Sequence, residues 1–278
     1  MGQNGAGRVV AITGASAGIG RATALRLARD GAAIVACARR ADRLEQLGQE
    51  IEAAGGRALT VVADVTREGD MNGLVGRAVE QFGRLDVMIC NAGFAIYGAI
   101  DDIRPDQMRK LVDVNYFGTY YATRAALPVF RRQDAGHIVM VSSIVGKRGV
   151  PFMGAYSATK FAQVGLAECL RSEVEGSGIH VSVVYPISTA TEFTEVMLRE
   201  TGSAITQSVG PKQTAEQVAD AIAEAIARPV PEVYPYAKSR GLVLLNAIAP
   251  GFCDRLVKKY GRQPVAAAER GLGPASRE

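Results

Sequence analysis

Short runs of apolar and β-branched residues alternate along this chain with longer segments whose apolar residues recur at helical spacing. The short runs predict strands at 8–13, 33–38, 58–63, 85–90, 137–141, 180–185 and 232–234. The longer segments predict helices at 19–29, 42–54, 68–82, 105–132, 155–175, 192–200 and 215–227. Because parallel neighbours need crossover helices, this alternation predicts one α/β domain, a doubly wound parallel sheet of about seven strands with helices on both faces.

The domain is expected to span 8–261, since no repeat or linker interrupts it. The stretches 1–7 and 262–278 are rich in Gly, Ala, Pro and charge, which predicts flexible ends. One apolar segment, 242–253, contains Asn246 and is broken by Pro250. It could cover a substrate pocket, form a subunit interface or touch a membrane surface, and burial is the interpretation we favour.

Composition narrows the class of protein further. The 278 residues are 48% hydrophobic and 22% charged with a net charge of +4, which is ordinary for a globular protein. No lysine-rich run indicates a nucleic-acid partner, and no signal peptide or membrane-spanning segment is visible. Four scattered cysteines without a Cys-x-x-Cys pair predict reduced thiols and a cytoplasmic setting. The two histidines lie far from other ligand types, so no metal site is expected.

A glycine-rich turn joins the first predicted strand to the first helix, in the segment Thr-Gly-Ala-Ser-Ala-Gly-Ile-Gly at 13–20. Without side chains, Gly14, Gly18 and Gly20 would let a pyrophosphate approach the backbone N–H groups of the helix N-terminus. Ser16 and Ile19 lie in the same turn. Glycines can also serve only to make a tight turn, but the flanking strand and helix favour cofactor binding.

The end of the second strand indicates which cofactor is bound. A carboxylate there would accept the ribose hydroxyls of NAD(H), but Arg39 and Arg40 follow the strand instead. Guanidinium groups match the geometry of a 2′-phosphate, so the sequence favours NADP(H) over NAD(H), although two exposed arginines are a simpler alternative. Further candidate cofactor contacts follow the next two strands: Asp64 and Val65 for adenine, and Asn91, Ala92 and Gly93 for the ribose and nicotinamide.

Tyr156 and Lys160 lie four residues apart on a predicted helix and therefore share a face. A free phenol has a pKa near 10, too high for a base at neutral pH. A cation at about 4 Å contributes about 4 kcal/mol at an effective dielectric constant of 20, enough to lower that pKa by a couple of units. Lys160 could also hold the ribose hydroxyls. Ser143 could hydrogen-bond the substrate oxygen, and Asn115, a polar interruption in an apolar helix, could hold a water that links Lys160 to solvent.

In this order and spacing, these residues resemble the classical short-chain dehydrogenase/reductase family over about 8–192. The resemblance implies a Rossmann-type fold and hydride transfer to or from the nicotinamide, with Tyr156 giving or taking the proton. It implies the catalytic set Asn115, Ser143, Tyr156 and Lys160. It also implies a homodimer or homotetramer, formed through the helices at about 105–132 and 155–175.

The sixth strand is followed by a departure from the family pattern. The family usually has Pro-Gly and then Thr, whereas this chain has Ile187 after Pro186. Pro186, Thr189 and Thr191 remain candidate cofactor contacts. The segment near 192–213 is expected to form a substrate lid. Apolar residues there and elsewhere suggest a partly apolar pocket: Phe94, Ile96, Tyr97, Phe152, Phe193, Met197, Leu198 and Ile205.

The leading hypothesis is therefore an NADP(H)-dependent reductase that converts a ketone or aldehyde to an alcohol, reversibly. An NAD-dependent alcohol or hydroxysteroid-type dehydrogenase is the nearest alternative. A protein of a different class, a catalytically silent scaffold that senses the cofactor, is the third.

Overall fold

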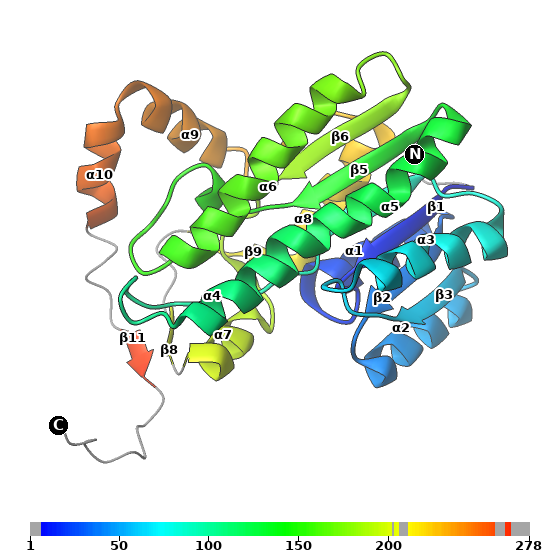
Figure 1. The fold of residues 1–278 in the computed structure, drawn as a ribbon, viewed down its shortest axis with the longest axis horizontal. Helices are drawn as coiled ribbons and strands as arrows, with labels where there is room; N and C mark the ends of the chain where they lie inside the picture. Colours follow the sequence, from blue (N-terminus) through cyan, green and yellow to red (C-terminus); the bar gives the residue numbers. More distant parts are fainter. Residues whose placement is uncertain (1–6, 202, 206–210, 259–264, 268–278) are drawn as a thin grey trace.

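A seven-stranded sheet forms the centre of the computed structural model, which describes residues 7–201, 203–205, 211–258 and 265–267 (Figure 1). Its strands are all parallel and follow the order β10-β6-β5-β4-β1-β2-β3. Their bounds are β1 Val9–Thr13, β2 Ala33–Ala38, β3 Arg57–Val62, β4 Val87–Cys90, β5 Gly136–Val141, β6 Ile179–Val184 and β10 Glu232–Val233. The predicted fold class is confirmed. After β3 the chain crosses to β4 on the other side of β1, a reversal of strand order beside which α/β proteins bind ligands.

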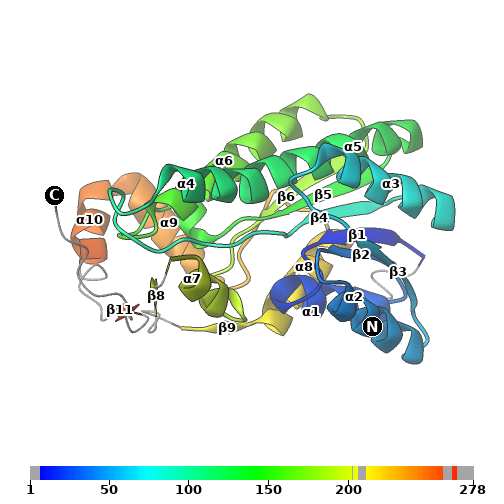
Figure 2. The same cartoon turned by 60° about the horizontal axis from the view of Figure 1, so that its bottom comes forward.

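Helices cover both faces of this sheet, as Figure 2 shows. One face carries α1 Gly18–Arg29, α2 Ala41–Ala53 and α8 Ala215–Ala227, and the other carries α3 Glu68–Phe82, α5 Gly118–Gln133 and α6 Gly154–Glu173. Successive strand residues point to opposite faces. In β1, Val10 and Ile12 join the core beneath α1 and α8, whereas Ala11 joins the core beneath α3 and α5. This double-sided burial is why the strands are continuous apolar runs.

The helix predicted at 105–132 is interrupted. The structure has α4 Pro105–Val112, a π-helical turn Asp113–Phe117, and then α5. The π turn lets the backbone carbonyl of Asn115 accept side-chain hydrogen bonds from Thr119 at 2.9 Å and Gln163 at 2.7 Å. π-helical turns inside α-helices frequently mark functional sites.

The segment after β6 packs over one end of the sheet. It contains β7 Thr189–Ala190, which pairs with β9 Gln213–Thr214, then α7 Phe193–Thr201 and β8 Ser203–Ile205. A further strand, β11 Val265–Ala267, pairs antiparallel with β8. The predicted flexible ends 1–7 and 262–278 lie outside the described residues, except for Gly7 and β11.

Two helices that the sequence reading did not identify follow β10, namely α9 Ser239–Ile248 and α10 Pro250–Lys258. They lie to one side of the sheet (Figure 1), joined to the body partly by Arg148, which donates to Asn246 at 2.9 Å and pairs with Asp254. The favoured burial of 242–253 is therefore wrong within this chain, because Leu244 is 57% exposed and Ile248 83%. Among the described helices, none has the length and hydropathy needed to span a bilayer.

Candidate cofactor-binding and catalytic site

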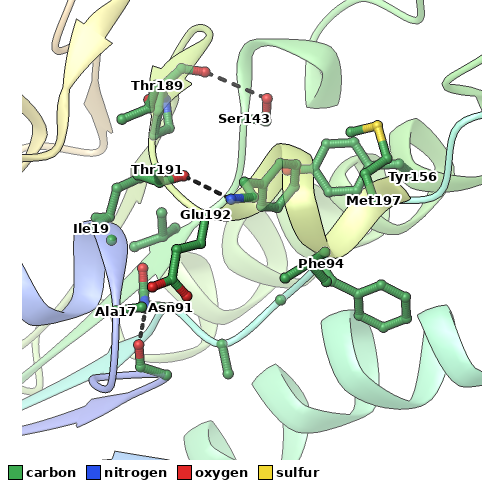
Figure 3. Close-up of a pocket in the computed structure, with 18 of the residues that line it drawn as sticks. Ala17, Ile19, Asn91, Phe94, Ser143, Tyr156, Thr189, Thr191, Glu192 and Met197 are labelled. Carbon is green, nitrogen blue, oxygen red and sulfur yellow. Dashed lines mark hydrogen bonds between the residues drawn. The ribbon is translucent and has the colours of Figure 1, made fainter. Parts of the chain in front are cut away.

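A cleft of about 860 Å³ opens where the strands of the sheet end, beside β1 and β4 (Figure 3). It brings together most of the residues that the sequence singles out, although they come from distant parts of the chain. Those lining it are Gly14, Ser16, Gly18, Ile19, Arg39, Arg40, Asp64, Val65, Asn91, Ala92, Gly93, Ser143, Tyr156, Lys160, Pro186, Thr189 and Thr191. Gly20 and Asn115 do not line the cleft and lie behind it.

The three glycines of the glycine-rich turn are needed for two different physical reasons. Gly14 and Gly18 have φ values of +69° and +53°, a backbone conformation that other residues rarely adopt. A Cβ at Gly20 would lie 2.4 Å from the carbonyl oxygen of Gly14. Gly20 therefore permits close packing within the turn, whereas Gly14 and Gly18 shape the wall of the cleft. The backbone N–H groups at the start of α1 remain suited to a pyrophosphate.

The ends of β1 and β4 are tied together under this turn. The Thr13 hydroxyl accepts hydrogen bonds from the backbone N–H groups of Asn91 at 3.0 Å and Ala92 at 3.1 Å. The Asn91 amide donates to the carbonyls of Thr13 at 2.9 Å and Gly14 at 3.3 Å, one of the contacts drawn in Figure 3. Asn91 thus fixes the turn as well as lining the cleft. Thr13 was not among the predicted site residues, although it stands in the quoted motif.

At the end of β2, the two predicted arginines behave differently. Arg39 lines the cleft. Arg40 donates to the Ser16 hydroxyl through Nε at 3.2 Å and Nη2 at 3.0 Å, and it pairs with Glu192 at 3.0 Å. Arg43, in the first turn of α2, pairs with the other oxygen of the same carboxylate. The Glu192 and Arg43 contacts were missed, because an ion pair between residues this far apart in the chain leaves no local signal.

Asp64 and Val65 follow β3 on the same side of the cleft. One oxygen of the Asp64 carboxylate accepts from the backbone N–H and the hydroxyl of Thr66, at 3.0 and 2.9 Å. Val65 lies against α5, where a Cβ on Gly118 would come within 2.7 Å of it. Thr66 thus fixes the Asp64 carboxylate, and α5 packs against Val65, on the wall of the cleft that is expected to meet adenine.

Tyr156 is almost fully buried at the start of α6, and its ring packs edge-on against Phe193 with centroids 5.7 Å apart. Burial raises the pKa of the Tyr156 phenol well above its usual value, and a hydrogen bond with Ser143 only partly opposes this. The prediction that Lys160 lowers the pKa of Tyr156 is therefore wrong for the protein without cofactor. At neutral pH the phenol carries its proton.

Lys160 lines the cleft but is only 3% exposed. Nζ donates to the carbonyl of Val141 at 2.9 Å and to Gln163 Oε1 at 3.1 Å, and it lies 5.6 Å from the centroid of the Tyr156 ring. Burial lowers the pKa of Lys160 to about 7. Gln163 stands three residues after Lys160, so helical spacing could have identified it as a partner.

The two adjacent serines after β5 have distinct roles. The Ser142 hydroxyl is buried and donates to the carbonyl of Lys160 at 3.0 Å, which ties β5 to α6. The Ser143 hydroxyl lies nearer the surface of the cleft, 3.4 Å from the carbonyl of Pro186 (Figure 3). Of the two, Ser143 is the one whose hydroxyl contacts Tyr156, as the sequence interval suggested.

Asn115 is fully buried, and its side-chain amide is already engaged. Its Oδ1 accepts from the Phe94 N–H at 3.0 Å, and its Nδ2 donates to the Phe94 carbonyl at 2.9 Å and to Thr159 at 3.0 Å. Asn115 thus joins the π turn to α6 and to the loop after β4. The structure gives it a positioning contact with this loop rather than a place in the cleft.

The Pro186-Ile187 departure is accommodated without strain. Ile187 is not among the residues with positive φ, so this backbone does not require the usual glycine. Its N–H donates to Gln213 Oε1 at 3.0 Å. Thr189 donates to the Ile187 carbonyl at 2.9 Å, and Thr191 accepts from the N–H of Phe193 at 3.3 Å. Both threonines line the cleft, and Thr191 starts the turn into α7.

An apolar wall completes the cleft on the Tyr156 side. Phe94, Tyr97, Phe193 and Met197 line it, and Figure 3 shows Met197 beside Tyr156. Of the other residues expected in an apolar pocket, Ile96 is buried beneath this wall and Phe152 packs on Tyr97 with ring centroids 5.7 Å apart. The side chains of Leu198 and Ile205 lie outside the described part of the structure.

The two histidines face each other across β5 and β6, with ring centroids 5.9 Å apart. Ser182 donates its proton to the Val230 carbonyl, so its oxygen accepts from Nε2–H of His137 at 2.8 Å. Nδ1 of His137 is then a buried atom without a hydrogen-bond partner. Burial lowers the pKa of His137 to about 3, which keeps the ring neutral. Among the described residues, no group of His, Cys, Asp and Glu could hold a metal ion.

Comparison with known proteins agrees with this geometry. The short chain dehydrogenase family matches residues 8–201. The chain is 38% identical over 202 residues to an uncharacterized oxidoreductase of Listeria innocua, covering 72% of this chain and 82% of the relative. It is similar to a 3-ketoacyl-ACP reductase from Sinorhizobium meliloti (35% identity, TM-score 0.73, 81% of this chain and 96% of that one). It is also similar to a metagenomic short-chain oxidoreductase in complex with NADP (29% identity, TM-score 0.71, covering 83% and 97%).

Proposed function

The chain belongs to the short chain dehydrogenase family of oxidoreductases, and we propose that it uses NADP(H) to reduce a ketone or aldehyde to an alcohol. One observation carries the proposal. The glycine-rich turn, the arginines that follow β2, and the pair Ser143 and Tyr156 all line one cleft, although they come from four separate parts of the chain. This arrangement supports the proposal of a proton donor beside a dinucleotide site.

The residues present fit such a cofactor. A volume of about 860 Å³ is in the range of small-molecule and cofactor sites. The turn at 14–18 has the left-handed glycines that leave its backbone open to a pyrophosphate. Arg39 and Arg40 stand where a carboxylate would favour NAD(H), which supports NADP(H). When bound, the reduced nicotinamide supplies the hydride that adds to the carbonyl carbon of the substrate.

The chain itself supplies the proton and the hydrogen bonds. Tyr156 donates its phenolic proton to the substrate oxygen as that oxygen gains negative charge, and Ser143 donates a hydrogen bond to the same atom. The resulting phenolate lies near the Lys160 ammonium and regains a proton from solvent. In the free protein the phenol carries its proton at neutral pH, which is the form that can donate it to the substrate oxygen.

Asn115, Thr189 and Thr191 have supporting roles in this proposal. Asn115 holds the loop after β4, so it positions Phe94 and the neighbouring Gly93 rather than meeting the substrate. Thr191 and Thr189 line the side of the cleft next to α7 and are proposed to contact the carboxamide or diphosphate of the cofactor.

The substrate is proposed to be partly apolar. The side chains that line this part of the cleft provide no charge to stabilise a charged group next to the reacting carbonyl: they are Phe94, Tyr97, Phe193 and Met197. The segment 192–213 that carries two of them is proposed to act as the substrate lid; its residues 202 and 206–210 lie outside the described part of the structure. Since one similar structure is a 3-ketoacyl-ACP reductase, a 3-ketoacyl thioester belongs in any substrate panel beside aliphatic and aromatic ketones and aldehydes.

We also propose a homodimer or homotetramer formed through the helices at about 105–132 and 155–175, which correspond to α4, the π-helical turn and α5, and to α6. Two aromatic side chains support it: Phe117, just before α5, is 38% exposed and Phe161 on α6 is 45% exposed. A reducing, cytoplasmic setting remains our proposal too. All four cysteines are free, and burial raises the pKa of the Cys37 and Cys90 thiols to about 12, which makes them unreactive.

Turnover of a carbonyl panel, followed by the near-ultraviolet absorbance of the reduced nicotinamide, tests the proposal. We expect NADPH to support reduction better than NADH, and Tyr156→Phe to lose turnover while it still binds NADPH. Equal use of both cofactors would refute the cofactor assignment in favour of an NAD-dependent dehydrogenase. An equally active Tyr156→Phe would refute the role of Tyr156, and cofactor binding without any turnover in the wild type would indicate the silent scaffold.

A further inference from the structure

Glu192 pairs with Arg40, one of the two arginines that the proposed function assigns to the cofactor, and with the neighbouring Arg43. Its carboxylate bridges Arg40 and Arg43, one oxygen to each guanidinium, while Arg40 also holds the Ser16 hydroxyl of the glycine-rich turn. Glu192 immediately precedes α7, so these ion pairs connect the start of the proposed lid to the start of α2. In Figure 3 the carboxylate extends from Thr191 toward the part of the cleft that carries Ala17.

Glu192 also separates two cavities. Together with Ser16, Ala17 and Gly18 it lines both the main cleft and a smaller neighbouring cavity of about 260 Å³. The remaining residues of the small cavity are polar or cationic: Arg21, Arg43 and Gln46. The glutamate therefore stands at the boundary of a polar cavity that lies next to the glycine-rich turn and contains two arginines, Arg21 paired with Glu50 and Arg43 paired with Glu192 itself.

A phosphate would be a stronger ligand for the same two guanidinium groups. It carries about −1.5 to −2 charge and three acceptor oxygens at neutral pH, whereas the glutamate carries a single charge. The side chains of Arg40, Arg43 and Glu192 are 42%, 41% and 37% exposed, and ion pairs this exposed contribute little and exchange readily. An anion of higher charge can therefore displace the Glu192 carboxylate from the two arginines without a large loss of protein stability.

We propose that Glu192 is an internal competitor for the 2′-phosphate of NADP(H), which displaces its carboxylate from Arg40 and Arg43. Arg43 is then a cofactor-selecting residue in addition to Arg39 and Arg40, and Glu192 sets how strongly the protein distinguishes NADP(H) from NAD(H). The inference rests on the proposed use of NADP(H), and it assigns a specificity role to two residues outside the predicted set.

Calorimetric titration of the full chain with adenosine 2′,5′-bisphosphate and with 5′-AMP tests this directly, because the two probes differ only in the 2′-phosphate. We expect Glu192→Gln to tighten the bisphosphate about three- to tenfold and Arg43→Gln to weaken it about tenfold, with 5′-AMP changed less than about twofold in both. Glu52→Gln is the matched control, since it removes the same charge from an exposed position near the C-terminal end of α2 and is expected to change neither affinity.

The outcomes separate this inference from the proposed function. If the wild type prefers the bisphosphate but Glu192→Gln does not tighten it, the competitor role is refuted and the NADP(H) assignment stands. If Glu192→Gln weakens 5′-AMP and NADH, the carboxylate holds ribose hydroxyls and the inference is wrong. If neither protein distinguishes the probes, both proposals fail. A preference that appears only in Glu192→Gln supports the competitor role and refutes NADP(H) selectivity in the wild type.

Discussion

Binding of NADPH is predicted to draw a proton onto Lys160, and the size of this effect follows from its burial. Burial lowers the pKa of Lys160 to about 7 in the free chain, and the acceptors of its ammonium group, the Val141 carbonyl and Gln163 Oε1, are both uncharged. Beside an anionic cofactor whose ribose hydroxyls it is proposed to hold, the ammonium form of Lys160 is favoured. With a free-state pKa of about 7 and a charged bound state, uptake is about 0.1 proton at pH 6, 0.5 at pH 7 and 0.9 at pH 8.

The sign of the linkage follows from the direction of that shift. The free protein holds fewer protons on Lys160 than the complex, so NADPH affinity should fall as pH rises above about 7, by up to about tenfold per pH unit. Calorimetric titration in two buffers of different ionisation enthalpy measures the proton uptake at each pH. Lys160→Met removes the titrating lysine but leaves the titration of the 2′-phosphate unchanged. The difference in proton uptake between the two proteins therefore measures the contribution of Lys160.

Two results would contradict this reasoning. Equal uptake in wild type and Lys160→Met at pH 8 would show that the lysine is already charged in the free protein. Uptake that is maximal at pH 6 would show that another group titrates. Unfolding of both proteins by urea is the control, because Lys160→Met also leaves the Val141 carbonyl and Gln163 without a donor.

The remaining predictions concern stability. His137 is neutral in the fold, with a pKa of about 3, so the free energy of unfolding should fall by about 1.4 kcal/mol for each pH unit below 6.5. His137→Leu should lose this dependence. Urea unfolding of both proteins at pH 7.5 and pH 5 measures the change, and an equal pH dependence in the two would refute the prediction. Gly20→Ala should cost about 1–3 kcal/mol, because its Cβ would lie 2.4 Å from the Gly14 carbonyl oxygen. Its control, Gly73→Ala on an exposed face of α3 with no atom within 4 Å of the new Cβ, should instead stabilise by about 0.5–1 kcal/mol. Equal thermal shifts in the two glycine variants would contradict the packing argument.

Features that depend on local periodicity were predicted from the sequence. The parallel sheet follows from apolar strand runs such as Val-Val-Ala-Ile-Thr at 9–13, whose alternate residues serve two cores. The cleft follows because the ends of parallel strands meet at one edge, which brings Gly14, Asn91 and Ser143 together. The four-residue spacing of Tyr156 and Lys160 within one helix predicted that both side chains lie on the same face of that helix.

Features that depend on desolvation or on distant pairs could not be obtained in this way. The expected lowering of the Tyr156 pKa counted one nearby cation but not the burial of both groups, which outweighs it. The Glu192 contacts with Arg40 and Arg43 join α2 to the segment after β6, and no periodic pattern records them. The exposure of α9 and α10 was missed because an apolar segment predicts a buried surface without indicating which surface covers it.

A single-turnover experiment on Tyr156→Phe loaded with NADPH tests the central claim most directly, since it separates proton donation from cofactor binding and product release. On mixing with a carbonyl substrate that the wild type reduces, we predict rapid loss of reduced-nicotinamide absorbance in the wild type and loss slowed by at least about a hundredfold in the variant, in line with removal of a general acid. Equal rates in the two proteins, with NADPH bound equally well, would contradict the assignment of Tyr156 as the proton donor.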